Sequence, residues 1–342
     1  MKAAILHGPG DLRIEEVPRT PLRHGEARIC IEAALTCGTD LKVFRRGTHS
    51  RMLHPPSAFG HEMAGTITEL GPGAHGWAPD ERVVVANSAP CGSCPACHRG
   101  QENLCDDLLF LNGAYAESIV VPERIVQRNL LRLDPSISFP DGALTEPLAC
   151  VVKGIEDCEI RHGQRVLVIG SGPIGLMFVR LCAELGCAVT VRGRGELRLA
   201  RARKLGATVV KDVPGELIVA GPIPPVGATP FDAVIEAVGK PETWKLAVDS
   251  VRKGGTVNLF GGCPPGTRIS LDASRIHYSD IRLRSSFHHT PRTVRKALEW
   301  IQRGVVRAAD FVDGECTLDD LPDLFRSMAE GNRAVKTLVR TR

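Results

Sequence analysis

Side chains with metal-binding chemistry fall into two different patterns along this chain. The first is a dense group of cysteines in one short stretch: Cys91, Cys94, Cys97 and Cys105. The second is spread over three distant stretches: Cys37, His61 and Glu146. Neighbouring ligands can enclose an ion within one loop, as structural zinc sites do, whereas scattered ligands depend on the fold, as catalytic zinc sites do. The chain therefore predicts one closed metal site and a second site with a coordination position open to a reactant.

The cysteine stretch has the spacing of a tetrahedral site with four thiolate ligands. The sequence reads Cys91-x₂-Cys94-x₂-Cys97-x₇-Cys105. An iron–sulfur cluster is one alternative, but ferredoxin sequences that begin in this way continue with a shorter gap and then a proline. Four thiols without a metal are the other alternative. We predict structural zinc in a lobe of about residues 88–108, where it holds the loop in shape and takes no part in chemistry.

A glycine-rich turn indicates dinucleotide binding. Its GxGxxG motif consists of Gly170, Ser171, Gly172, Pro173, Ile174 and Gly175. The motif lies between an apolar run that predicts a buried strand and a stretch with helical spacing. The first glycine permits the tight turn, the second lets the backbone approach a pyrophosphate, and the third lets helix and strand pack closely. The alternative is a glycine-rich turn in an unrelated α/β domain.

The end of the next predicted strand bears on which dinucleotide is bound. An NAD site normally has Asp or Glu there, roughly 20 residues beyond the fingerprint, to bind the ribose hydroxyl. Gly193 occupies this position, and it is surrounded by arginines: Arg192, Arg194 and Arg198. A guanidinium can make charge-assisted, bidentate contacts with a 2′-phosphate. We predict NADP rather than NAD; in the alternative, these arginines are a solvated helix start and NAD binds less selectively.

The first third of the chain predicts a β-rich domain, because short β segments alternate with Gly and Pro and few helical patterns interrupt them. We expect strands in four stretches: Ala27–Leu35, Glu62–Glu69, Arg82–Ala86 and Ala114–Val121. The domain covers residues 1–148, and the cysteine lobe is one of its loop insertions.

Beyond Glu146, strands alternate with helices, which predicts a doubly wound parallel sheet and an α/β fold. The expected strands are Arg165–Ile169, Ala188–Val191, Phe231–Ala237 and Gly255–Phe260. The expected helices are Leu148–Ile155, Pro173–Leu185, Glu196–Leu205 and Pro241–Val251. This second domain covers residues 149–285. Residues 286–342, with helices at Pro291–Arg303 and Leu318–Glu330, return to the first domain, and Pro214–Pro230 is expected to be a loop because it is rich in Pro and Gly.

Composition argues against several classes of function. The formal net charge is only +4 and the basic residues are dispersed, so no nucleic-acid or membrane footprint stands out. Aromatic residues make up 4% of the chain, which is few for base-stacking surfaces. The N-terminus does not have the pattern of a signal peptide, and no apolar run approaches the ~20 residues that span a bilayer. We expect a cytoplasmic protein whose cysteines are thiols or thiolates.

Several motifs in a fixed order give the chain a resemblance to a known family. They are CGTD at Cys37–Asp40, GHE at Gly60–Glu62, the cysteine lobe, EPLAC at Glu146–Cys150 and GSGPIG at Gly170–Gly175. Together they resemble the zinc-dependent medium-chain dehydrogenases, close to the sorbitol/polyol and threonine dehydrogenase branch. The resemblance implies a GroES-like β-rich catalytic domain, a Rossmann coenzyme domain and an active site in the cleft between them. It also implies a homo-oligomer, either a dimer or a tetramer.

The resemblance places the family's catalytic zinc on Cys37 and His61. Glu146 would be the third ligand or would hold the zinc-bound water, and Glu62 would enter or leave the coordination shell. Cys150 is the alternative ligand if its segment is helical. Each residue alone also has a structural explanation, such as a small buried side chain for Cys37 or a hydrogen-bonded core histidine for His61. With the cysteine lobe, the prediction is two zinc ions per chain.

The resemblance also assigns a proton relay. The hydroxyl of Thr39 would contact the substrate oxygen and start the relay. Many relatives have a histidine three residues later as its outer end, but this chain has Lys42. Lys42 could contact the cofactor ribose or a substrate charge, or the proton could leave through water. The departure weakens the similarity to threonine dehydrogenases in particular.

The remaining predicted contacts lie near the cofactor and the substrate. Val238 and Gly261 follow predicted strands and are expected to flank the nicotinamide. Phe287 is expected beside the cofactor. The next two residues, His288 and His289, fall in the region that lines the pocket of polyol dehydrogenases, where they would contact a substrate with several hydroxyls. The alternative is a surface turn with solvated histidines.

These expectations combine into an enzyme that oxidises a small-molecule secondary alcohol, a polyol, sugar or cyclitol, reversibly to a ketone. Zinc would lower the pKa of the alcohol and NADP would accept the hydride. Within the same class, the alternative is an NAD-linked threonine or butanediol dehydrogenase. From another class, the alternative is a non-catalytic zinc protein that uses its dinucleotide fold to sense redox state.

Overall fold

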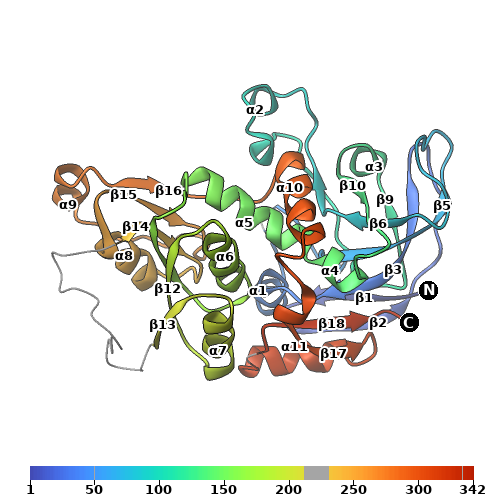
Figure 1. The fold of residues 1–342 in the computed structure, drawn as a ribbon. Coiled ribbons are helices and arrows are strands. Elements are labelled where there is room, and N and C mark those ends of the chain that lie inside the picture. The colour runs from blue at the N-terminus through green and yellow to red at the C-terminus, as the bar shows by residue number, and fades with distance from the viewer. Residues whose placement is uncertain (50, 212–230, 333) are drawn as a thin grey trace. The chain divides into compact units, whose positions relative to one another are not determined.

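The computed structural model describes residues 1–49, 51–211, 231–332 and 334–342. The chain divides into two compact units (Figure 1). Unit 1 consists of Met1–Ala149 and His289–Arg342, and unit 2 consists of Cys150–His288. The loop expected over Pro214–Pro230 lies outside the described residues.

Unit 1 is built on a mixed sheet, seven-stranded within the described residues. Its spatial order is β10 (Leu130–Arg132), β6 (Arg82–Val85), β5 (Met63–Leu70), β3 (Ala27–Leu35), β18 (Lys336–Arg340) and β17 (Val312–Thr317), and β9 (Ser118–Val121) also pairs with β3. Strands β17 and β18 run parallel, whereas β18 pairs with β3 in the antiparallel sense, with Leu338 opposite Leu35. This pairing brings the last strand of the chain next to the segment that leads into Cys37.

Two smaller sheets complete the strands of unit 1. The first consists of β2 (Asp11–Glu16), β1 (Lys2–Gly8) and β4 (Ser57–Ala58). The second pairs β7 (Ser88–Ala89) with β8 (Leu109–Phe110), which closes the base of the cysteine lobe. The strand expected over Ala114–Val121 begins only at Ser118, because Ala114 and Tyr115 instead donate backbone hydrogen bonds to Gly60 and Phe59.

The described part of unit 1 contains several short helices that the sequence did not predict. Its helices are α1 (Gly38–Arg46), α2 (Pro95–His98), α3 (Glu123–Asn129), α4 (Phe139–Ala143), α10 (Pro291–Gln302), α11 (Leu321–Glu330) and the 3₁₀ turns η1 (Glu102–Leu104) and η2 (Ala308–Asp310). Helices α10 and α11 correspond to the helices expected at Pro291–Arg303 and Leu318–Glu330, whereas α1 and α3 were not expected. Helices of about two turns leave too few apolar positions for a clear 3.6-residue pattern, and packing rather than propensity stabilises them.

An aromatic cluster lies in the core of unit 1. Phe325 on α11 packs against Phe59 and Phe44, with ring centroids 5.3 and 5.6 Å apart. Tyr115 joins the cluster at 5.8 Å from Phe59. The rings of Tyr115, Phe59 and Phe325 are almost fully buried. The cluster therefore fixes the Tyr115 ring, and with it the position of the phenol hydroxyl inside unit 1.

Unit 2 contains a parallel sheet, which confirms the predicted doubly wound α/β fold. Its order is β13 (Thr208–Lys211), β12 (Ala188–Gly193), β11 (Arg165–Ile169), β14 (Phe231–Glu236), β15 (Val251–Leu259) and β16 (Arg282–Arg284). The helices that accompany it are α5 (Thr145–Asp157), which starts in unit 1, α6 (Pro173–Glu184), α7 (Glu196–Lys204), α8 (Pro241–Ser250) and α9 (Ala273–Tyr278). The strand order reverses between β11 and β14, and ligands of such sheets bind at the carboxyl ends of the strands at this point.

The helix expected over Leu148–Ile155 begins earlier, at Thr145, so that Glu146 lies in its first turn. Among the helices of the described residues, none combines the length and the apolar character that crossing a bilayer requires.

Candidate functional site

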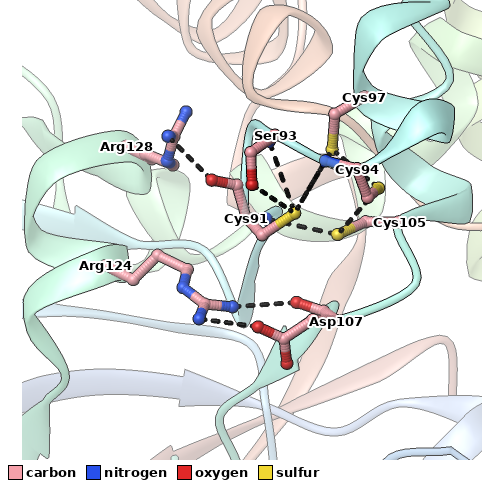
Figure 2. Close-up of polar contacts among 8 residues, drawn as sticks. All are labelled: Cys91, Ser93, Cys94, Cys97, Cys105, Asp107, Arg124 and Arg128. Carbon is pink, nitrogen blue, oxygen red and sulfur yellow. Dashed lines mark hydrogen bonds and ion pairs between the residues drawn. The ribbon is translucent and has the colours of Figure 1, made fainter.

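The four cysteines of the lobe direct their sulfur atoms toward one another (Figure 2). The Sγ atom of Cys94 lies 3.5 Å from that of Cys97 and 3.8 Å from that of Cys105, and the Sγ atoms of Cys91 and Cys97 are 4.0 Å apart. A tetrahedron with zinc–sulfur bonds of ~2.3 Å separates its sulfur atoms by about 3.8 Å. A disulfide needs about 2.05 Å, and a four-iron cluster, with each thiolate on a different iron, needs wider spacing. The arrangement fits four-thiolate zinc.

Hydrogen-bond donors of the lobe itself surround these sulfur atoms (Figure 2). The Sγ atom of Cys91 accepts hydrogen bonds from the backbone N–H groups of Ser93, at 3.4 Å, and Cys94, at 3.3 Å. The Ser93 hydroxyl lies 3.6 Å from the same sulfur, and the N–H of Cys91 donates to Cys105 Sγ at 3.2 Å. The Ser93 and Cys94 donors lower the pKa of Cys91 to about 6. Cys91 is therefore favoured as thiolate, the form that binds metal. Burial raises the pKa of Cys97 to about 12 and raises that of Cys105, so these two thiols need a nearby cation to lose their protons.

Helix α3 anchors the lobe to the rest of unit 1. Arg128 donates a hydrogen bond to the carbonyl of Cys91 at 3.2 Å. Arg124 binds Asp107 through both the backbone carbonyl and the carboxylate, each at 2.8 Å (Figure 2). One contact lies at the start of the cysteine stretch and the other lies just after its end. Helix α3 therefore holds both ends of the stretch in place.

A second group of potential metal ligands lies in unit 1, where His61 and Glu62 are buried and Cys37 is half-buried. Potential ligand atoms of Cys37, His61 and Glu62 all lie within 4.8 Å of one another. Cys37 is the N-cap of α1, where its Sγ accepts a hydrogen bond from the N–H of Thr39 at 3.4 Å. His61 and Glu62 immediately precede β5. Burial raises the pKa of the Cys37 thiol, so a nearby cation is needed to keep it as thiolate.

Groups outside this trio orient His61. The Asp40 carboxylate, on the first turn of α1, lies 2.8 Å from His61 Nδ1. Its other oxygen accepts a hydrogen bond from the Tyr115 hydroxyl at 2.6 Å. Burial alone would lower the pKa of His61, but Asp40 and Cys37 outweigh it and hold the pKa well above its usual value. A carboxylate on one ring nitrogen leaves the other nitrogen to face a metal, an arrangement common for zinc-binding histidines.

Lys336 on β18 opposes the charge of Glu62. Its ammonium group contacts Glu62 Oε2 and donates to the carbonyl of Thr36 at 3.0 Å. Burial disfavours the charged ammonium, yet the carboxylate of Glu62 raises the pKa of Lys336 above its usual value. The other oxygen of Glu62, Oε1, makes no hydrogen bond to any described residue although it is buried. A buried oxygen of this kind fits a position beside a cation.

The structure places Glu146 with a different partner. In the first turn of α5, its Oε1 lies 3.7 Å from His289 Nε2. His289 is 2% exposed, and the same nitrogen is 3.0 Å from the side-chain oxygen of Asn87. Burial raises the pKa of Glu146 to about 7 and lowers that of His289 to about 3. In this conformation Glu62, rather than Glu146, completes the group with Cys37 and His61.

The other residues that the sequence predicted near the metal and the substrate differ in their exposure to solvent. Thr39 is half-buried in the first turn of α1, and Lys42 is exposed on the same helix. Within the described residues, Cys150 belongs to no group of potential ligands. In unit 2, Phe287 is 37% exposed, and His288 adopts a left-handed backbone with a φ of 60°.

The glycine fingerprint forms a tight turn between β11 and α6 in unit 2. Gly170 has a φ of 117°, a conformation that favours glycine. A Cβ atom on Gly175 would lie 1.9 Å from the carbonyl oxygen of Gly170, so only glycine lets the helix approach the strand this closely. At Gly172 a Cβ would meet no atom within 4 Å, which leaves open space over the backbone. This space and the start of α6 at Pro173 fit a pyrophosphate at the helix N-terminus.

The strand after the turn carries the predicted arginines. Gly193 is the last residue of β12. Arg192 is buried, Arg194 is exposed and Arg198 is half-buried in the first turn of α7. These residues lie at the end of β12 and the start of α7, and Ile174 lies at the start of α6.

Two loops beyond β14 and β15 hold Val238 and Gly261. Glu236 at the end of β14 accepts backbone hydrogen bonds from Val238 at 2.8 Å and Gly239 at 2.9 Å. The indole of Trp244 donates to the carbonyl of Gly261 at 2.9 Å. The sequence did not predict the contacts by which Glu236 and Trp244 hold these loops. It also did not predict the contacts of Asp40 and Lys336 with the candidate metal ligands. Two features of the sequence could have indicated such contacts. They are a carboxylate at the end of an apolar strand and a lysine within the apolar run AVKTLV.

Comparisons with known proteins match both units. The model of the alcohol dehydrogenase GroES-like domain matches residues 23–130, and that of the zinc-binding dehydrogenases matches residues 173–303. The D-altritol 5-dehydrogenase of Agrobacterium fabrum is 31% identical over 91% of this chain and 91% of its own. The sorbitol dehydrogenase of Bacillus subtilis is 28% identical over 99% and 97%. The solved structure of a protein assigned as a zinc-binding dehydrogenase from Sinorhizobium meliloti 1021, bound to NADP, has a TM-score of 0.87 and 29% identity over 99% and 98%.

Proposed function

Because the chain belongs to the zinc-dependent medium-chain alcohol dehydrogenase family, we propose that it reversibly oxidises a secondary alcohol of a polyol or sugar to a ketone with NADP. The observation that carries the proposal is the convergence of Cys37, His61 and Glu62 in a buried site with an unsatisfied carboxylate oxygen. The proposed ligands of the catalytic zinc are these three side chains, and those of a structural zinc are the four lobe cysteines.

Each residue around the site has a distinct part in the proposed reaction. Zinc would supply a Lewis acid that lowers the pKa of the alcohol, and the nicotinamide would supply the hydride acceptor. Thr39, two residues after Cys37, offers a hydroxyl that would accept the alcohol proton while passing its own proton on to water. Asp40 holds the His61 ring in place, and Lys336 balances the charge of Glu62.

Three observations support the choice of substrate and cofactor. Relatives over nearly the whole chain are dehydrogenases of D-altritol and sorbitol, which are both polyols. The position that carries an acidic residue in NAD sites is Gly193, with Arg194 and Arg198 close by in sequence. The structural relative from Sinorhizobium meliloti is bound to NADP.

Steady-state rates with NADP⁺ and NAD⁺ over a panel of polyols, sugars, threonine and butanediol test the proposal. We expect the highest kcat/KM with NADP⁺ and a polyol or sugar. Equal or higher values with NAD⁺ would refute the cofactor assignment, and a preference for threonine or butanediol would refute the substrate class. Nucleotide binding without reduction on any alcohol would favour a redox sensor instead.

A further inference from the structure

The hydroxyl of Ser171 joins the glycine-rich turn to the end of β12. Ser171 Oγ donates a hydrogen bond to the carbonyl of Arg194 at 2.8 Å and accepts one from the N–H of Arg194 at 3.1 Å. The neighbouring backbone adds a third link, from the N–H of Gly170 to the carbonyl of Arg192 at 2.7 Å. Ser171 is 5% exposed, so these bonds are shielded from water. The glycine-rich turn therefore holds the segment from Arg192 to Arg194 at both of its ends.

The same serine fills the space beside Gly193. A Cβ atom on Gly193 would lie 2.5 Å from Ser171 Oγ, 2.7 Å from Ser171 Cβ and 2.9 Å from its backbone nitrogen. Ordinary van der Waals contacts between carbon atoms lie at about 3.5–4.0 Å. A rotation of the serine side chain would relieve only the first contact, because Cβ and the nitrogen belong to the turn itself. Any side chain at position 193 must therefore displace the turn or the strand end.

We propose that Ser171 and Gly193 act as a pair that determines cofactor choice, with Ser171 as a positioning residue for the 2′-phosphate end of NADP. This inference rests on the proposed NADP dependence. Ser171 excludes an acidic side chain from position 193, the place where NAD sites hold their ribose-binding carboxylate. It also fixes the backbone of Arg194, so that less freedom is lost when this loop closes on a phosphate.

Cofactor choice should then depend on both residues and not on Gly193 alone. Gly193→Asp introduces a carboxylate that repels a 2′-phosphate, but the crowded turn prevents it from reaching the ribose. Ser171→Gly removes the two side-chain atoms and leaves only the backbone nitrogen close, which a small shift relieves. Only in the double variant do we therefore expect the aspartate at position 193 to reach the ribose hydroxyl of NAD.

The test compares kcat/KM for NADP⁺ and NAD⁺ in the holoenzyme with Gly193→Asp, Ser171→Gly and both changes. We expect Gly193→Asp to lose NADP⁺ activity without gaining NAD⁺ activity, and the double variant to exceed it with NAD⁺ by about tenfold or more, a coupling typical of residues in contact. If Gly193→Asp alone uses NAD⁺ as well as the double variant does, the pair does not exist. This comparison holds whichever dinucleotide the wild type prefers, so it fails separately from the proposed function.

A binding experiment tests the positioning role without turnover. Ser171→Ala removes the hydroxyl, and Ser250→Ala is the matched control, because its hydroxyl also bonds a backbone carbonyl in unit 2, that of Leu246 at 2.7 Å. Calorimetry would measure the affinities of 2′,5′-ADP and 5′-AMP. We expect Ser171→Ala to lower the ratio of the two affinities several-fold and Ser250→Ala to leave it unchanged. A loss shared equally by both nucleotides would show a general structural role and overturn the proposal.

Discussion

The cysteine lobe and the buried Cys37–His61–Glu62 site bring metal-binding side chains together in opposite ways. The lobe takes all its potential ligands from one stretch and surrounds them with its own backbone donors. The Cys37–His61–Glu62 site takes side chains from a helix N-cap and from the two residues before β5, and it depends on charged partners elsewhere in unit 1. A local site can therefore be predicted from spacing, whereas an assembled site depends on residues that spacing does not show.

The largest expected effect separates the two sites by their role in catalysis. Cys37→Ser should lower turnover by about a thousandfold or more, because it removes a ligand of the metal on which the chemistry depends. Binding of 2′,5′-ADP should remain. The matched variant, Cys97→Ser in the lobe, should retain most of its initial turnover at low temperature. Initial rates and nucleotide affinity check both expectations. Equal losses of turnover in the two variants would contradict the view that only the Cys37 site takes part in catalysis.

Lys336→Met tests how strongly the buried site depends on a remote strand. Removing one partner of a buried ion pair leaves the other charge uncompensated, at a cost of about 3–5 kcal/mol in the free energy of unfolding. Urea unfolding of the zinc-free protein measures this cost. Combining the change with Glu62→Gln should recover much of the stability, since the uncompensated charge is then gone. A cost that persists in full in the double variant would point to packing instead.

Asp40→Asn tests the partner of His61. Mutations of such outer partners lower metal affinity by roughly 10–100-fold. A chelator should therefore remove the zinc ion at the Cys37–His61–Glu62 site at a lower concentration than in the wild type. Removal of the lobe zinc should remain unchanged. Release of both ions at the same altered rate would contradict the view that the two sites are independent.

The smallest effect is expected in the lobe itself. Ser93→Ala removes one hydroxyl at 3.6 Å from Cys91 Sγ but keeps the backbone donors of Ser93 and Cys94. Lobe zinc affinity should fall by less than the roughly tenfold lower limit for outer-shell partners. Chelator competition measures it, with turnover per active site as the control. A loss as large as that of Asp40→Asn would mean that the lobe also depends on side chains beyond its ligands.

The sequence predicted the regular parts of the fold well because they have strong local patterns. The apolar strand Arg165–Ile169 has the predicted bounds, and the helix after the fingerprint ends at Glu184, one residue before its expected end. The short helix α1 was missed although it presents Cys37, Thr39 and Asp40. Its first turn is set by a cysteine N-cap, which is not among the usual capping residues.

Sequence patterns could single out a residue such as Lys336, but they could not show which side chain of the candidate site it contacts. Lys336 meets Glu62 only because β18 pairs with β3, and Tyr115 reaches Asp40 only because the aromatic cluster fixes its ring. Both contacts join segments far apart in the chain. Spacing rules describe neighbours along one helix, strand or loop, so they cannot predict such pairs.

Elemental analysis of the purified protein would show whether the chain holds two separate zinc ions. We expect about two zinc ions per chain in the wild type and about one in each of the variants Cys37→Ser and Cys97→Ser. Only Cys37→Ser should lose turnover at the same time. A fully active wild type with a single zinc, retained in Cys37→Ser and lost in Cys97→Ser, would contradict this expectation.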